Sequence, residues 1–136
     1  MSIHDYPIAA GMTATDLGRC GENLVAYVLE RNGMPCTVVD RRGTDMWCSR
    51  GDGKLITLEV KSSLSLANVG VSGHSFGINT VKADWVAFVS LIRESVIFRP
   101  WASIKNRHRV HIRVADFTPE AMQSTFKDMY GGVTHD

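Results

Sequence analysis

The chain has 136 residues, and its 15 basic and 14 acidic residues leave a formal net charge of +1. This length predicts one domain spanning residues 1–136, and a composition of 44% hydrophobic and 21% charged residues is typical of a globular protein. No run of about 18 apolar residues occurs, so the sequence predicts no transmembrane helix.

The N-terminus and the cysteines indicate the compartment. Met1 to Gly11 has no basic stretch followed by an apolar core, so we expect no signal peptide. Cys20, Cys36 and Cys48 are odd in number and widely spaced, which predicts neither a disulfide framework nor a zinc site. We therefore expect reduced thiols in a cytoplasmic protein that has no membrane partner.

The first predicted element is a helix that follows an N-terminal arm of residues 1–12. Thr13 and Thr15 are both candidates for its N-cap, and the apolar period ends near Asn32, before Gly33. The stripe expected to face the core comprises Leu17, Cys20, Gly21, Leu24, Val25 and Val28. This pattern indicates a helix that packs on its neighbours by one face.

Two glycines and one acid in this helix need a separate explanation. Gly18 and Gly21 each cost about 1 kcal/mol relative to alanine in a helix interior. We expect a close approach between the helix and a sheet to offset that cost. Glu22 borders the apolar stripe, where its carboxylate can point along the sheet surface toward a site.

Strands and a hairpin are predicted next. Residues 36–39 and 45–49 form the first two strands, with a polar turn at 40–43 between them. The stretch Arg50-Gly51-Asp52-Gly53 predicts a tight turn, and the returning strand covers residues 54–61.

The returning strand ends in an acid and a base. Residues i and i+2 of a strand point to the same face, so Glu59 and Lys61 stand side by side while Val60 points into the core. Counting back from the turn places Asp45 near their level on the neighbouring strand. If Glu-x-Lys stood alone, an ion pair at the end of a strand would explain it. The acids upstream therefore decide between such an ion pair and a functional site.

The second half of the chain is predicted to contain a long loop, more strands and a C-terminal helix. Residues 62–77 are rich in serine and glycine and are expected to form the loop, in which His74 has no special role. The other predicted elements are strands at 76–81, 84–91, 95–99 and 107–114, a turn or short helix at 100–104, and a helix at 119–129 that is capped by Thr118 and followed by a loose tail, 130–136.

Basic residues concentrate between Lys105 and Arg113. This segment has four of the 15 lysines and arginines and no acid, so the rest of the chain has 11 basic residues and 14 acidic ones. Such a stripe is typical of a phosphate-contacting surface, although a solvated edge strand explains it about equally well. Contacts to nucleic acid would come from Lys105, Arg107, Arg109 and Arg113.

The acids and the lysine together indicate a type of chemistry. Carboxylates such as Glu22, Asp45 and Glu59 supply the oxygen ligands that suit Mg²⁺ or Mn²⁺ better than zinc. Three carboxylates at one sheet edge would repel each other unless a divalent cation neutralised them. Lys61 could hold an attacking water or stabilise negative charge on a phosphate. If these groups converge, they predict hydrolysis of a phosphodiester.

The order of these motifs resembles the PD-(D/E)XK nuclease superfamily. Gly18-x-x-Gly21-Glu22 on a helix is followed by Gly43-Thr44-Asp45 and then by Glu59-Val60-Lys61. Within the superfamily, the chain is similar to small Holliday-junction resolvases and to homing endonucleases of the same fold. The resemblance spans about residues 15–63 and continues weakly through 84–89 and 98–100. It implies an α/β restriction-endonuclease-like fold, with a central mixed β-sheet flanked by helices in a single domain.

The resemblance also assigns roles to individual residues. It implies that Asp45 and Glu59 bind Mg²⁺ or Mn²⁺, with the backbone carbonyl of Val60 as a further ligand. Lys61 would orient or activate the water, and Glu22 would act directly or through a water. Weaker expectations are phosphate contacts from Ser62 or Ser63.

One departure from the pattern affects the choice of aspartate. Thr44 stands where the superfamily's name has proline. Asp40 therefore stays open as a second candidate ligand in place of Asp45, while Asp52 is explained by its turn.

The expected function is a metal-dependent DNA endonuclease. Its substrate would be either branched DNA, as for a Holliday-junction resolvase, or a specific duplex site, as for a homing or restriction enzyme. Cutting both strands requires two active sites, so a homodimer or a higher homo-oligomer is expected. The alternative is a nucleic-acid-binding or assembly module on the same fold without catalysis, but such a module has no reason to keep clustered carboxylates.

Overall fold

A computed structural model describes residues 13–64 and 73–132, except for the side chain of Asp40. The predicted N-terminal arm, 1–12, and residues 133–136 of the predicted tail lie outside the described residues. Within them, five strands form a sheet in the order β1-β2-β3-β5-β6, and two more form a ribbon, β4-β7. The strands are β1 Cys36–Arg41, β2 Thr44–Ser49, β3 Leu55–Ser63, β4 Gly73–Gly77, β5 Trp85–Ser90, β6 Ser95–Pro100 and β7 Arg109–Arg113.

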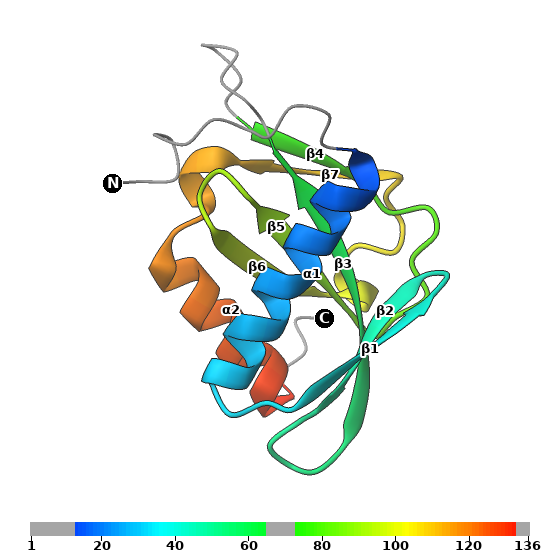
Figure 1. The fold of residues 1–136 in the computed structure, drawn as a ribbon, viewed down its shortest axis with the longest axis vertical. Coiled ribbons are helices and arrows are strands. Elements are labelled where there is room, and N and C mark those ends of the chain that lie inside the picture. Colours follow the sequence, from blue (N-terminus) through cyan, green and yellow to red (C-terminus); the bar gives the residue numbers. More distant parts are fainter. Residues whose placement is uncertain (1–12, 65–72, 133–136) are drawn as a thin grey trace.

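The five-stranded sheet is mixed. β3 and β5 run parallel, and every other neighbouring pair is antiparallel. The helices α1 (Ala14–Arg31) and α2 (Pro119–Gly131) pack on one face of the sheet through a shared apolar cluster (Figure 1). The predicted fold, a central mixed sheet flanked by helices, is confirmed, with both helices on the same face. Neither of these two described helices is long and apolar enough to cross a bilayer.

The start of α1 is set by two reciprocal hydrogen bonds. The Asp16 backbone N–H donates to Thr13 Oγ1 at 3.2 Å, and the Thr13 N–H donates to Asp16 Oδ2 at 2.9 Å. This capping box satisfies two backbone donors that a helix terminus leaves without partners. It identifies Thr13, rather than Thr15, as the N-cap.

Gly21 allows α1 to lie directly on β3. A β-carbon built at Gly21 would lie 1.6 Å from Oγ and 2.9 Å from Cβ of Ser62. The predicted close approach is therefore confirmed for Gly21. It is wrong for Gly18, because nothing outside the helix's own backbone lies within 4 Å of a β-carbon there.

We expect Gly21→Ala to lower the free energy of unfolding by about 2 kcal/mol, because the new methyl group must displace helix or strand. Ser62→Gly removes both colliding atoms, so the double variant should recover most of the loss in urea denaturation. Gly18→Ala is the matched control and should stabilise the helix by up to about 1 kcal/mol. Equal stabilities of the two alanine variants would contradict the close contact.

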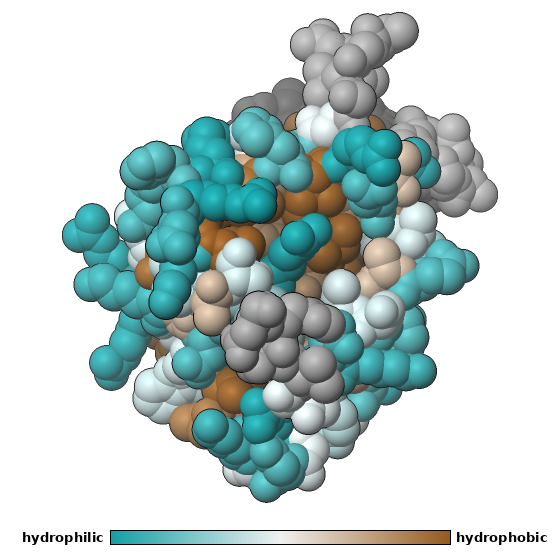
Figure 2. Space-filling view, turned by 180° about the vertical axis from the view of Figure 1, so that it is seen from behind, coloured by the Kyte–Doolittle hydropathy of each residue, from teal (hydrophilic) through white to brown (hydrophobic). Residues whose placement is uncertain are grey.

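The ribbon β4-β7 covers the other face of the sheet. Phe76 of β4 packs against Phe88 of β5, with 4.9 Å between ring centroids. Val110 and Ile112 of β7 are buried in the same cluster. Seen from behind, the molecule shows apolar surface surrounded by hydrophilic side chains (Figure 2).

The predicted loop over residues 62–77 is wrong at both ends. Ser62 and Ser63 continue β3, and residues 73–77 form β4. The strand predicted over 76–81 is correspondingly displaced toward the N-terminus. The glycines and serines suggested a loop. In β4, however, they occupy the outward positions, and the buried inward positions between them are filled by His74 and Phe76.

The C-terminal half otherwise follows the prediction closely. β5 and β6 form the expected antiparallel hairpin, and a short 3₁₀ helix follows at Trp101–Ser103. The Thr118 side chain caps α2 by accepting from the Ala121 N–H at 3.0 Å. The helix ends at Gly131 and is capped by Gly132, whose φ of 75° is left-handed. The first two residues of the predicted tail, 130 and 131, are therefore helical.

Candidate active site

The hairpin of β2 and β3 brings Asp45 opposite Glu59. Met46 pairs with Leu58 in antiparallel register, and the next position along both strands is Asp45 with Glu59. The Val60 backbone N–H donates to Oδ2 of Asp45 at 2.7 Å. This bond holds the Asp45 carboxylate beside the end of β3, at the level predicted from the hairpin.

Glu59 is the most perturbed acid of the site. The residue is 7% exposed, its Oε1 lies 3.8 Å from Lys61 Nζ, and its Oε2 is buried without a hydrogen-bond partner among the described residues. Burial is the largest cause that raises the pKa of Glu59 from 4.5 to about 8. The neighbouring carboxylate of Asp45 and the negative charge of Glu22 act in the same direction, while the positive charge of Lys61 lowers this pKa. The three other predicted catalytic groups therefore all act on Glu59.

Glu22 reaches this site from the opposite layer of the fold. It follows Gly21, whose contact with Ser62 sets the position of α1 against the end of β3. Its charge raises the pKa of Glu59, so its carboxylate lies near enough to influence the site. The half-buried position at the border of the apolar stripe agrees with the sequence prediction.

These residues fit a hard divalent cation held mainly by two carboxylates. Asp45 and Glu59 lie side by side, and Glu59 Oε2 is buried without a partner. A cation between them would relieve the repulsion that raises the pKa of Glu59. Mg²⁺ commonly binds through one or two carboxylates and keeps several waters. In residues 13–64 and 73–132, no three His, Cys, Asp or Glu side chains are arranged to enclose a metal ion.

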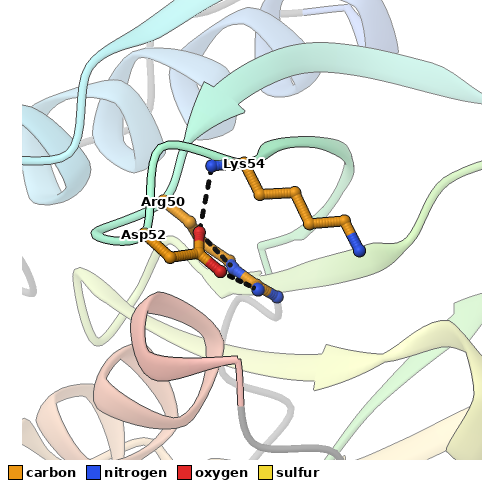
Figure 3. A network of polar contacts seen from close by, with 3 residues as sticks. All are labelled: Arg50, Asp52 and Lys54. Atoms are coloured by element: carbon orange, nitrogen blue, oxygen red, sulfur yellow. Dashed lines mark hydrogen bonds and ion pairs between the residues drawn. The ribbon is translucent and has the colours of Figure 1, made fainter.

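The two other candidate aspartates lie elsewhere. The Asp52 carboxylate accepts from the Lys54 backbone N–H at 3.0 Å and from Arg50 Nε at 3.3 Å (Figure 3). The bond from Arg50 is the largest cause that lowers the pKa of Asp52 to about 2, so this residue belongs to the turn, as predicted. Asp40 lies in β1, which β2 separates from β3, and its side chain is outside the described residues.

The two serines after Lys61 have different surroundings. Ser62 faces α1, where its buried Oγ has no hydrogen-bond partner among the described residues. Ser63 shares the face of Glu59 and Lys61, and its Oγ is 3.0 Å from Nδ1 of His74. A direct phosphate contact is thus more compatible with the face of Ser63 than with that of Ser62.

His74 was not identified as important from the sequence. It is 2% exposed in β4, and its Nε2 lies 2.9 Å from Ser90 Oγ while Nδ1 contacts Ser63. Its ring packs against Phe117 with 5.4 Å between centroids, and burial lowers its pKa. The expectation of an ordinary loop residue is wrong, because His74 ties the ribbon to the ends of β3 and β5. The alternation of His74 and Phe76 with small residues was the available signal.

The basic residues fall into two groups. Lys105 and Arg107 lie in the exposed segment before β7, so the strand predicted at 107–114 is shorter than expected. Arg109 and Arg113 lie on the exposed face of β7. Arg113 forms an ion pair with Asp116 at 3.1 Å, which partly neutralises its charge.

Comparison with known proteins supports the fold independently of the motifs. No protein-family model matches the sequence, and no curated protein matches it. Among solved structures, the bacterial homing endonuclease I-Ssp6803I superimposes with a TM-score of 0.58 and 16% identity, over 74% of this chain and 75% of that chain. The chain shares the fold of a homing endonuclease. At this identity the similarity confirms the fold, and membership of the PD-(D/E)XK superfamily stays a prediction.

Proposed function

We propose that the protein is a metal-dependent DNA endonuclease of the PD-(D/E)XK type. The observation that carries this proposal is the convergence of Asp45, Glu59 and Lys61 at the end of β3, with the charge of Glu22 on α1 acting on Glu59. The fold shared with a homing endonuclease adds support by analogy of the scaffold, while the chemistry is argued from the site residues.

The residues can divide the work of phosphodiester hydrolysis. Asp45 and Glu59, together with the Val60 carbonyl, would hold Mg²⁺ or Mn²⁺, which when bound polarises a phosphate oxygen and lowers the pKa of a water. The Val60 N–H keeps Asp45 oriented. Lys61 places a positive charge beside Glu59, where it can orient the water or stabilise charge on the phosphate.

Duplex DNA is the first candidate substrate and branched DNA the second. The structural neighbour is a homing endonuclease, which favours a site on duplex DNA, while the residue pattern is also similar to Holliday-junction resolvases. Either substrate is cut on two strands, so the protein would work as a homodimer or a higher homo-oligomer.

The buried acid argues against a module that only binds. Ionised Glu59 is unfavourable in its site, as its raised pKa shows, and glutamine in its place would avoid that cost. A protein without catalysis would gain from such a replacement. A role for the acid in binding a cation explains why it is there.

The test is cleavage of supercoiled plasmid, a four-way junction and a matched linear duplex with Mg²⁺ or Mn²⁺. We expect the wild type to cut at least one of them, Asp45→Asn to lose the activity, and Asp52→Asn, in the turn, to keep it. Calorimetric titration should show Mg²⁺ binding that depends on Asp45. A wild type that cuts none of these and binds no Mg²⁺ would instead be the binding module.

A further inference from the structure

The outward face of the ribbon β4-β7 has a regular composition. At each outward position of β4 stands a small residue, and opposite it on β7 stands a basic one. The register gives three such pairs: Gly73 with Arg113, Ser75 with His111, and Gly77 with Arg109. The inward positions are all buried: His74, Phe76, Val110 and Ile112.

The small residues let the long side chains of β7 lie across β4. Arg109 Nε donates to Ser75 Oγ at 2.8 Å, and its Nη2 donates to the Ser75 carbonyl at 3.3 Å. A β-carbon at Gly77 would lie only 3.3 Å from Nη1 of the same arginine. The guanidinium is thus held flat on the outer face, with N–H groups left for another acceptor.

The charge of this surface is not balanced locally. Arg113 has Asp116 as its partner, but Arg109 forms no ion pair among the residues that the structure describes. Lys105 and Arg107 precede it on the same exposed segment, and no acid occurs between Lys105 and Arg113. An excess of cations on a flat surface attracts a polyanion.

The ribbon and the candidate active site lie on the same side of the sheet. Glu59, Lys61 and Ser63 lie on the same face of β3. The Ser63 Oγ is 3.0 Å from Nδ1 of His74 in the ribbon. Ser63 lies about 7 Å along the strand from Lys61. The inner face of the ribbon therefore adjoins the end of β3, and its outer face is on the same side of the sheet as Glu59 and Lys61.

We propose that the ribbon β4-β7 enters the major groove of the DNA that the site cleaves, with Arg109 and His111 contacting base edges. This inference rests on the proposed function. The major groove, about 12 Å wide, admits a two-stranded ribbon without deformation of the duplex, whereas the undeformed minor groove is about 6 Å wide. Glycines in a strand allow close approach of its backbone to a ligand, and an arginine fork matches the acceptors of guanine. Lys105 and Arg107 would then contact phosphates.

The test compares binding to two forms of the same duplex pool without divalent metal. One form is unmodified, and in the other glucosylated hydroxymethylcytosine replaces cytosine and fills the major groove. We expect wild-type affinity to fall at least tenfold on the modified DNA. Arg109→Ala should lose about tenfold on unmodified DNA and little on the modified form, because the contact is already blocked there.

A second variant distinguishes the contribution of positive charge to DNA affinity from that of a contact with the bases. Arg109→Lys keeps the charge but not the fork, so it should bind nearly as weakly as Arg109→Ala. Lys127→Ala, on the exposed side of α2 in the other layer, is the control and should bind like the wild type. Thermal denaturation of each variant shows whether the fold is kept.

Two results would overturn the inference, and they differ in what they say about the nuclease. Full rescue by Arg109→Lys, with equal affinity for both DNA forms, would make the ribbon a phosphate contact only and leave the nuclease in place. Absence of any DNA binding, together with absence of plasmid cleavage by the wild type, would remove the proposed function as well.

Discussion

Lys61→Ala should lower the rate of Mg²⁺-dependent DNA cleavage by about a hundred- to a thousand-fold without unfolding the protein. Lys61 is the cation nearest to Glu59, at 3.8 Å, and its side chain is 23% exposed, so it can face both the buried carboxylate and a substrate. Removing it takes away the positive charge that would stabilise the phosphate as negative charge develops. The measurement is single-turnover cleavage of plasmid at several pH values.

The pH profile separates this role from a purely structural one. Lys61 lowers the pKa of Glu59, so its loss should raise that pKa and shift the remaining activity toward higher pH. Lys54→Ala is the matched control, because Lys54 is an exposed lysine directly before the same strand. A Lys61→Ala protein that cuts at the wild-type rate with an unchanged pH profile would contradict the role of Lys61 in cleavage.

Glu59→Gln should make the protein without metal more stable at alkaline pH. The folded pKa of Glu59 is about 8 against 4.5 as the ordinary value, so between these values the folded state holds a proton that the unfolded state has lost. The free energy of unfolding of the wild type therefore decreases as pH rises from about 4.5 through about 8. Glutamine does not titrate, and the variant's advantage at pH 9 relative to pH 5 should be on the order of 2 kcal/mol.

Mg²⁺ should reverse this difference. Binding requires ionised Glu59, so Mg²⁺ should stabilise the wild type more at pH 9 than at pH 6. It should have little effect on Glu59→Gln, which has lost an anionic ligand. Urea denaturation at several pH values, with and without Mg²⁺, measures both effects. Parallel pH curves for the wild type and Glu59→Gln would show that the acid is not held in the buried site described above.

Local patterns predicted most of the secondary structure. The caps Thr13 and Thr118 satisfy helix N–H groups within three residues, so the sequence near each helix start determines where it begins. The turn at residues 50–53 determines the hairpin register, and this short-range constraint places Asp45 opposite Glu59. The side-by-side placement of Glu59 and Lys61 follows from strand alternation alone.

The ribbon could not be predicted in the same way, because its stability is not local. Ser75 meets Arg109 across 34 residues of chain, and the strand β4 is stabilised by apolar packing of Phe76 on Phe88. Glycine and serine have low strand propensity, so composition suggested a loop. His74 likewise acquired its role only when two strands placed Ser63 and Ser90 around it.

By itself, the sequence determined the cap of the second helix, the hairpin and the set of acids and lysine that suggested a nuclease. Only the tertiary structure decided that α1 approaches β3 closely at Gly21, that the charge of Glu22 acts on Glu59, and that burial raises the pKa of Glu59. The physical reason is that caps and alternation depend on neighbours along the chain. Desolvation and charge–charge interaction depend instead on groups that only packing brings together.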